Sequence, residues 1–154
     1  MTDVTVTEVG ECQCGAISFK LDGPIKFSMI CHCKPCSRFT GSQDTHLVGI
    51  SNEYFSFSSG EDKLKIYEGK LVQAFCGECG SPIYQHPPGA DFKAVYPTSF
   101  RYEQGEVGCL LPEDYKPTAR VNYENRLFDV TDTMPKFKTW PSGEKCENDG
   151  KIIS

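Results

Sequence analysis

Hydrophobic positions along this chain fall in short stretches rich in β-branched and aromatic residues, with glycine and proline spread between them as turn punctuation. One of them, Ala16-Ile17-Ser18-Phe19, alternates as a strand does. The predicted strands cover residues 4–9, 16–21, 27–30, 46–50, 54–58, 64–67, 72–75, 82–84, 92–96 and 119–123. Such spacing predicts a mostly β protein built of antiparallel strands.

Helical periodicity does not extend over any long segment, which disfavours an α-rich architecture. The one helix that the early part of the chain predicts is short, residues 34–39. We find no internal repeat and no low-complexity linker, so we expect a single domain over residues 1–154.

The composition, 38% hydrophobic and 12% aromatic residues, is typical of a globular protein long enough to bury a core. No segment is apolar enough to suggest a membrane partner. Residues 1–10 are polar and lack the apolar run of a signal peptide, so we expect the cytoplasm, with the nucleus as an alternative. The formal net charge is −5, and it becomes −8 if seven cysteines bind two zinc ions as thiolates, adding −7 and +4. This acidity disfavours a nucleic-acid partner.

Seven of the nine cysteines fall into three tight clusters. We call Cys12 with Cys14 and Cys76 with Cys79 the outer pairs, and Cys31, Cys33 and Cys36 the middle cluster. Thiolates at these spacings can converge on one metal ion. A structural zinc takes four protein ligands, whereas a catalytic zinc takes three and keeps a position open. Seven ligands therefore predict one closed and one open site.

Two other uses of the cysteines are weaker. A disulfide framework needs an oxidising compartment, and loops as short as Cys-x-Cys or Cys-x-x-Cys remove little unfolded-state entropy. A thioredoxin-like role for Cys76 and Cys79 would require a βαβ context, and the pattern predicts none.

Local sequence indicates how the clusters are held. Glycines beside Cys76 and Cys79 permit the turn of a metal knuckle between two predicted strands. Cys36 would lie in the first helical turn, where the helix dipole lowers a thiol pKa. Counting alone leaves open whether the middle cluster forms the open site or closes a four-ligand site with one outer pair.

The remaining candidates have weaker support. In an extended chain the His32 ring would point away from a metal on its neighbours, so we expect a second-shell or surface imidazole. His46 and His86 could carry protons or bind zinc, although lone histidines are usually neither. By default Cys109 is a small buried group and Cys146 an exposed tail thiol.

Three ordered motifs carry a family resemblance: GECQCG at residues 10–15, CHCKPCSR at 31–38 and FCGECGSP at 75–82. They resemble the glutathione-dependent formaldehyde-activating enzyme family, which also includes centromere protein V. The similarity is close over residues 4–100 and looser in the C-terminal third, which includes Phe137 and Trp140.

The resemblance implies a β-tent fold of packed antiparallel sheets with one or two short helices and two zinc ions per chain. It places a structural zinc on the outer pairs and a second, open zinc on the middle cluster, and it implies carbon–sulfur lyase chemistry on a small-molecule thiol such as glutathione. An open site could bind a thiol substrate as thiolate or act as a Lewis acid on an aldehyde oxygen. Arg38 and Lys34 are the nearest cations for the substrate's carboxylates. The alternatives are a zinc-stabilised interaction module without catalysis and a zinc or thiol redox sensor.

Overall fold

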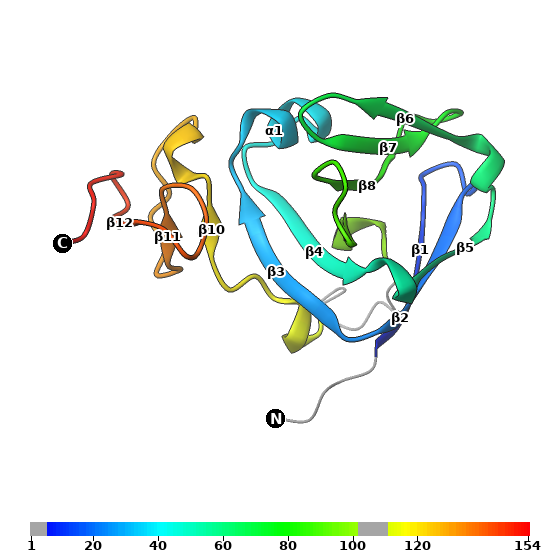
Figure 1. Cartoon of the computed structure of the whole chain (residues 1–154), viewed down its shortest axis with the longest axis horizontal. Helices are drawn as coiled ribbons and strands as arrows, with labels where there is room; N and C mark the ends of the chain where they lie inside the picture. Colours follow the sequence, from blue (N-terminus) through cyan, green and yellow to red (C-terminus); the bar gives the residue numbers. More distant parts are fainter. Residues whose placement is uncertain (1–5, 102–110) are drawn as a thin grey trace, which may run out of the picture. The chain divides into compact units, whose positions relative to one another are not determined.

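The computed structural model describes residues 6–101 and 111–154. It confirms the mostly β prediction: in the described part of the chain the only α-helix is α1 (Lys34–Thr40), close to the predicted 34–39 (Figure 1). The chain divides into two compact units. The first comprises Met1–Phe27 and Val48–Tyr115, and the second Ser28–Leu47 and Lys116–Ser154. The single-domain expectation stays a prediction.

Every predicted strand overlaps an observed one, although residues 4 and 5 of the first lie outside the described residues. The strands are β1 (Val6–Glu11), β2 (Ser18–Gly23), β3 (Ile25–Cys31), β4 (Thr45–Ser51), β5 (Phe55–Ser59), β6 (Leu64–Glu68), β7 (Val72–Cys76), β8 (Pro82–His86), β9 (Phe92–Val95), β10 (Arg120–Val121), β11 (Lys136–Phe137) and β12 (Lys145–Cys146). Short 3₁₀ turns are η1 (Asn52–Tyr54), η2 (Glu61–Lys63), η3 (Pro97–Ser99), η4 (Glu113–Tyr115) and η5 (Tyr123–Asn125). The two-residue strands β11 and β12 were not predicted, because two residues carry no alternation.

The first unit contains two antiparallel layers. One is the three-stranded sheet β1-β2-β5. In the other, the Val48–Ser51 part of β4 pairs with β9, and the order continues through β8 and β7 to β6. Buried apolar residues from both layers, such as Leu21 of β2 and Ile83 of β8, pack between them.

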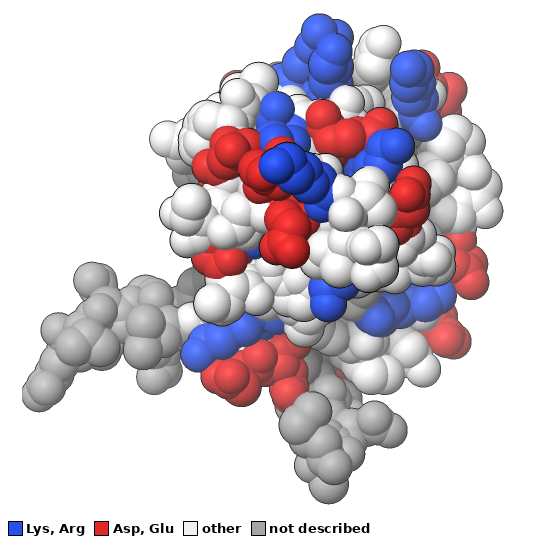
Figure 2. Space-filling model, turned by 90° about the vertical axis from the view of Figure 1, so that its left-hand side faces the viewer, with Lys and Arg blue, Asp and Glu red and all other residues white. Residues whose placement is uncertain are grey.

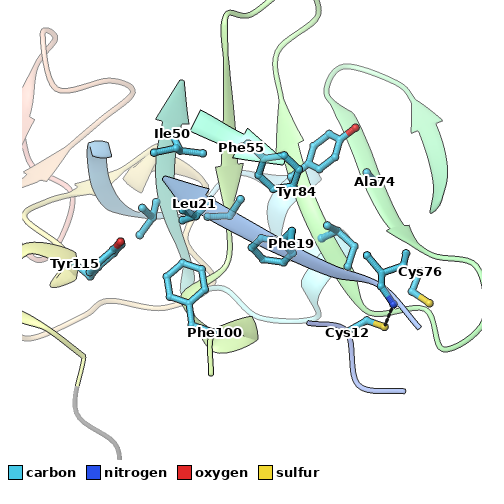
Figure 3. Packing of buried hydrophobic residues seen from close by; sticks show 14 residues of the cluster. Cys12, Phe19, Leu21, Ile50, Phe55, Ala74, Cys76, Tyr84, Phe100 and Tyr115 are labelled. Atoms are coloured by element: carbon cyan, nitrogen blue, oxygen red, sulfur yellow. Dashed lines mark hydrogen bonds between the residues drawn. The ribbon is translucent and has the colours of Figure 1, made fainter. Parts of the chain in front are cut away.

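The core of the first unit lies between these layers (Figure 3). Phe19 and Leu21 of β2 are fully buried, and Phe19 stacks on Phe55 of β5 with ring centroids 5.3 Å apart. Phe55 in turn meets the edge of Tyr84 from β8. Cys12 and Cys76 belong to the same buried cluster, so a metal bound by the outer pairs would be anchored in the core.

The second unit departs from purely antiparallel pairing at β10. This strand runs parallel to β3, with Val121 opposite Cys31, and parallel to β11, which pairs antiparallel with β12. The direction of so short a strand could not be read from the sequence. The pairing places the residue after Val121 beside the middle cluster.

Buried charges stabilise this unit. Lys136 is 2% exposed and its Nζ lies 2.6 Å from Asp132 Oδ1. Arg120, also buried, pairs with Asp132 and, at 2.7 Å, with Asp44. We call these four residues the buried ion network.

Candidate metal centres

The outer pairs come together in the first unit, although the Cys14 and Cys76 thiols are 62 residues apart in sequence. Cys12 Sγ lies 3.6 Å from Cys14 Sγ, and Cys14 Sγ lies 3.9 Å from Cys76 Sγ. Sulfurs on a tetrahedral zinc with 2.3 Å bonds are about 3.8 Å apart. All four sulfurs lie within 4.8 Å of one another, so the group fits a four-coordinate ion.

Two similar turns position these thiols. One follows β1, where the Gly15 N–H donates to Cys12 O, and the other follows β7, where the Gly80 N–H donates to Cys76 O. Gly15 and Gly80 have φ of 79° and 80°, a conformation that side chains other than glycine rarely adopt. The glycines therefore let each turn present two sulfurs on the same side.

Hydrogen bonds hold the outer sulfurs in place. The Ile17 N–H donates to Cys12 Sγ at 3.2 Å, and the Glu78 N–H donates to Cys76 Sγ at 3.4 Å. Ser81 Oγ lies 3.2 Å from Cys79 Sγ and accepts the Gln13 N–H, which links the two turns. The donors to Cys12 and Cys76 are backbone amides close to them in sequence.

The pKa values of Cys14 and Cys79 are shifted in opposite directions. The side chain of Ser81, followed by its backbone N–H, lowers the pKa of Cys79 to about 6. The Ala16 N–H lowers the pKa of Cys14, but desolvation and the neighbouring thiols outweigh it and raise that pKa to about 12. Cys79 is therefore the more readily ionised of the two thiols.

The middle cluster forms in the second unit, where β3 leads into α1. Cys31 ends β3, and Cys33 is the N-cap of α1 and accepts the Cys36 N–H at 3.4 Å. The Cys33 and Cys36 sulfurs are 3.0 Å apart, closer than on a zinc ion, so they would separate slightly around a metal. All three sulfurs lie within 4.8 Å of one another. Three thiol donors fit a tetrahedral ion with its fourth position open.

Cys31 has the lowest pKa of the three thiols in the middle cluster. Hydrogen bonds from Cys33 and Cys36 lower the pKa of Cys31 to about 3. The same contacts, Cys31 first, raise the pKa of Cys36 above its ordinary value. The expectation that the Cys36 pKa is lowered is wrong, because the neighbouring Cys31 and Cys33 sulfurs and burial raise it.

His32 is buried, which excludes the surface part of its prediction. Its Nε2 lies 3.1 Å from Arg120 Nη1 and 3.8 Å from Asp44 Oδ1. A guanidinium can only donate, so Nε2 is the acceptor, and burial, followed by Arg120, lowers the pKa of His32. Its Nδ1 has no hydrogen-bond partner among the described residues. The His32 ring therefore contacts Arg120 and Asp44 and is not grouped with the three thiols on either side of it.

The other histidines lie outside both groups. His46 Nε2 lies 2.7 Å from Ser28 Oγ, and His86 Nδ1 lies 2.8 Å from Pro87 O. Across residues 6–101 and 111–154, the groups that could hold a metal contain only cysteines.

Arg38 and Lys34 are both exposed and lie on α1, the helix that carries Cys36. Lys34 begins the helix and Arg38 lies in its last turn. Their role toward a substrate stays a prediction.

The two remaining cysteines lie apart from the metal groups. Cys109 lies outside the described residues. Cys146 is 5% exposed, so the prediction of an exposed tail thiol is wrong. It lies in β12, which pairs with β11 and buries it, and its thiol donates to Lys136 O.

One residue near the middle cluster was not predicted. The Asn122 side-chain amide donates to Cys31 Sγ at 3.2 Å across 91 residues of sequence. A lone asparagine between turn residues carries no metal-ligand pattern, so only the β3–β10 pairing reveals it.

The two groups predict the metal content. Purified protein is expected to hold two zinc ions per chain, and the ion on the outer pairs should resist chelators longer because four thiolates hold it. Elemental analysis with a chelator time course measures both. A single tightly bound zinc, with all three thiols of the middle cluster freely alkylated, would contradict the two-site interpretation.

None of the helices in the described part of the chain is long and apolar enough to cross a membrane.

Comparisons with known proteins support the fold and identify the family. A crystal structure of a Rhodobacter sphaeroides protein superposes with a TM-score of 0.54 at 17% sequence identity, covering 73% of this chain and 99% of that one. At this identity the likeness concerns the fold alone. A search of the curated proteins gives no match. The family model of the glutathione-dependent formaldehyde-activating enzyme matches residues 7–125, a span that includes the outer pairs and the middle cluster, and the chain therefore belongs to that family.

Proposed function

We propose that the protein is a zinc-dependent carbon–sulfur lyase acting on a thiol–aldehyde adduct such as S-(hydroxymethyl)glutathione or a related thiol conjugate. The observation that carries this proposal is the middle cluster itself: three convergent thiols in a chain of this family, with no further metal-binding side chain grouped with them in the described residues. A purely structural zinc would be expected to have four protein ligands.

The reaction breaks one carbon–sulfur bond. In the lyase direction the adduct hydroxyl loses its proton as the C=O bond forms, and the sulfur leaves with the bonding electron pair. A zinc ion on the middle cluster would supply a fourth position that stabilises this sulfur as thiolate. The reverse direction joins the thiolate to the aldehyde carbon and returns a proton to the oxygen.

The chain's own residues would hold the substrate near the middle cluster. Glutathione carries two carboxylates, and the exposed cations Arg38 and Lys34 lie on the helix that presents Cys36. We propose that they attract the carboxylates, although each alone contributes little where solvent screens it. On the face that Figure 2 shows, basic and acidic residues are interspersed and the coloured residues form no continuous basic stripe. That face therefore lacks the basic patch that a nucleic acid would require.

Cobalt substitution tests whether the middle cluster accepts a thiol. Adding glutathione to the cobalt-loaded protein is expected to strengthen the sulfur-to-cobalt charge-transfer bands, because a fourth thiolate joins three. Cys36→Ser should lose this response. Cys146→Ser is the matched control, since its thiol is buried outside both groups, and it should respond normally.

Turnover provides the second measurement. The protein should accelerate exchange between free formaldehyde and its glutathione adduct, followed by NMR line broadening, and Cys36→Ser should abolish the acceleration. A folded cobalt-loaded protein without spectral change in glutathione, cysteine and small dithiols would refute the lyase and favour an interaction module. Loss of metal on mild oxidation without turnover would favour a redox sensor, for which the Cys33–Cys36 sulfur distance of 3.0 Å is suited.

A further inference from the structure

The contact between Asn122 and Cys31 depends on the parallel pairing of β3 with β10. Val121 lies opposite Cys31 in this ladder, and the His32 N–H donates to Val121 O at 3.0 Å. The next residue, Asn122, therefore lies beside the last residue of β3. Its Nδ2 reaches Cys31 Sγ at 3.2 Å.

The backbone of Asn122 is held in an unusual conformation. With φ 53° and ψ 37° it lies in the left-handed region, and no other residue except glycine has a positive φ in the described part of the chain. Its N–H donates to Thr139 O at 2.6 Å, and its carbonyl accepts the Asn125 N–H at 3.0 Å. Asparagine tolerates this region better than most residues, yet glycine would fit it without strain. Asparagine at this position combines the left-handed backbone with a side-chain amide that reaches Cys31.

An amide N–H that points at a thiolate withdraws negative charge from the sulfur and fixes its orientation. Such partners of metal ligands tune the metal and its affinity. Cys33 receives a comparable bond from a backbone N–H three residues away. Cys31 receives one from the nearby Cys33 backbone and a second, from Asn122, that comes from a distant segment through a side chain. Substitution can therefore remove this donor without changing the local chain around the ligand.

We propose that Asn122 is a positioning residue of the middle cluster: its N–H···S hydrogen bond holds Cys31 as a ligand and makes that sulfur a poor nucleophile. This inference rests on the proposed function: a hydrogen-bonded Cys31 would not attack the aldehyde, so the substrate sulfur alone would take part in carbon–sulfur chemistry. A cluster whose own thiolates stayed reactive toward an aldehyde would lose a ligand to the electrophile.

Three variants distinguish the effect of the Asn122 side-chain amide from the effect of its backbone conformation. Asn122→Gly keeps the left-handed backbone and removes the amide, and Asn122→Asp keeps the shape but replaces the donor with an acceptor. Asn122→Ala removes the amide and adds backbone strain, so its thermal stability relative to Asn122→Gly reports that strain together with the lower unfolded-state entropy of alanine.

The readouts use the cobalt-loaded protein without substrate. The sulfur-to-cobalt bands should move to longer wavelength in all three variants, because the Cys31 sulfur gives up an electron more easily when it lacks the hydrogen bond from Asn122. Metal affinity of the middle cluster, measured by chelator competition, should fall about tenfold to a hundredfold. Iodoacetamide should alkylate Cys31 faster in the metal-loaded variants, as mass mapping would show.

Unchanged bands, affinity and alkylation in Asn122→Gly and Asn122→Asp would overturn the proposal. The result is independent of turnover: shifted bands in the variants, with no thiol response in the unmodified protein, would refute the lyase and leave the role of Asn122 at the metal intact.

Discussion

Replacing Cys76 by serine is expected to unfold the first unit, whereas replacing Cys36 by serine should leave a folded protein. A metal on the outer pairs connects turns that are 62 residues apart in sequence, and Cys76 is fully buried in the core cluster. Zinc binding by such sites contributes about 10–16 kcal/mol in zinc-finger peptides, comparable to the whole stability of a domain, about 5–15 kcal/mol. Losing one ligand is therefore expected to remove most of the free energy that stabilises the folded unit.

A metal on the middle cluster contributes less to the folding stability than one on the outer pairs. Its ligands span only the junction between β3 and α1, so the metal closes a short loop with little unfolded-state entropy to remove. We expect Cys36→Ser to reduce the free energy of unfolding by about 1–2 kcal/mol, a typical cost for one buried substitution.

Thermal unfolding followed by circular dichroism, with metal content measured on the same samples, compares these variants. Cys146→Ser is the control for replacing a buried thiol that belongs to neither group, and its midpoint should stay near that of the unmodified protein. Equal loss of stability in Cys76→Ser and Cys36→Ser would mean that the two groups do not differ in structural role.

The strands were predictable because their signal is local. Apolar and polar residues alternate along β2, and the burial of Phe19 and Leu21 follows that alternation. Boundaries shifted by a residue or two where turn residues join a ladder, as Gly23 does at the end of β2. By contrast, β11 and β12 exist only because neighbouring segments offer hydrogen-bond partners.

The candidate ligands were predictable for the same reason, since each cysteine lies close in sequence to another. Counting thiols left their partition open, and only the family resemblance assigned the outer pairs to one ion and the middle cluster to another. The spatial grouping depends on β7 returning beside the β1–β2 turn, a contact between distant segments. Through the parallel pairing of β10, Asn122 contacts Cys31 and Arg120 contacts His32, and no local pattern encodes that pairing.

Replacing Asp132 by asparagine is expected to reduce the free energy of unfolding of the second unit by about 3 kcal/mol. Lys136 and Arg120 are 2% and 7% exposed, and Asp132 balances both. Breaking a buried pair by removing one partner costs about 3–5 kcal/mol, and the lower end applies because the Asp132 side chain is 33% exposed. Chemical denaturation at neutral pH measures the loss.

The pH dependence of this loss has a definite sign. Partial burial raises the pKa of Asp132, but hydrogen bonds from Lys136 and Arg120 outweigh it and hold the pKa below its ordinary value. A carboxylate with a depressed folded pKa contributes stability above its unfolded pKa, about 3.9, and that stability is lost as pH falls through the folded value. The gap between the unmodified protein and Asp132→Asn should thus stay constant from about pH 7 to 5 and narrow below about pH 4. Both proteins lose metal in acid, and comparing them at the same pH cancels the loss of stability that this metal release causes.

A second substitution distinguishes an unpaired buried charge from a simple packing defect. Lys136→Met keeps the length of the side chain and removes the cation, while Arg120 keeps Asp44 as a partner at 2.7 Å. If the cost of Asp132→Asn comes from leaving Lys136 charged and buried, adding Lys136→Met should recover a large part of it, because well-packed apolar residues often replace a buried pair at little cost. Losses that simply add in the double variant would show that the two residues contribute independently, and the buried ion network would then not be the source of the stability.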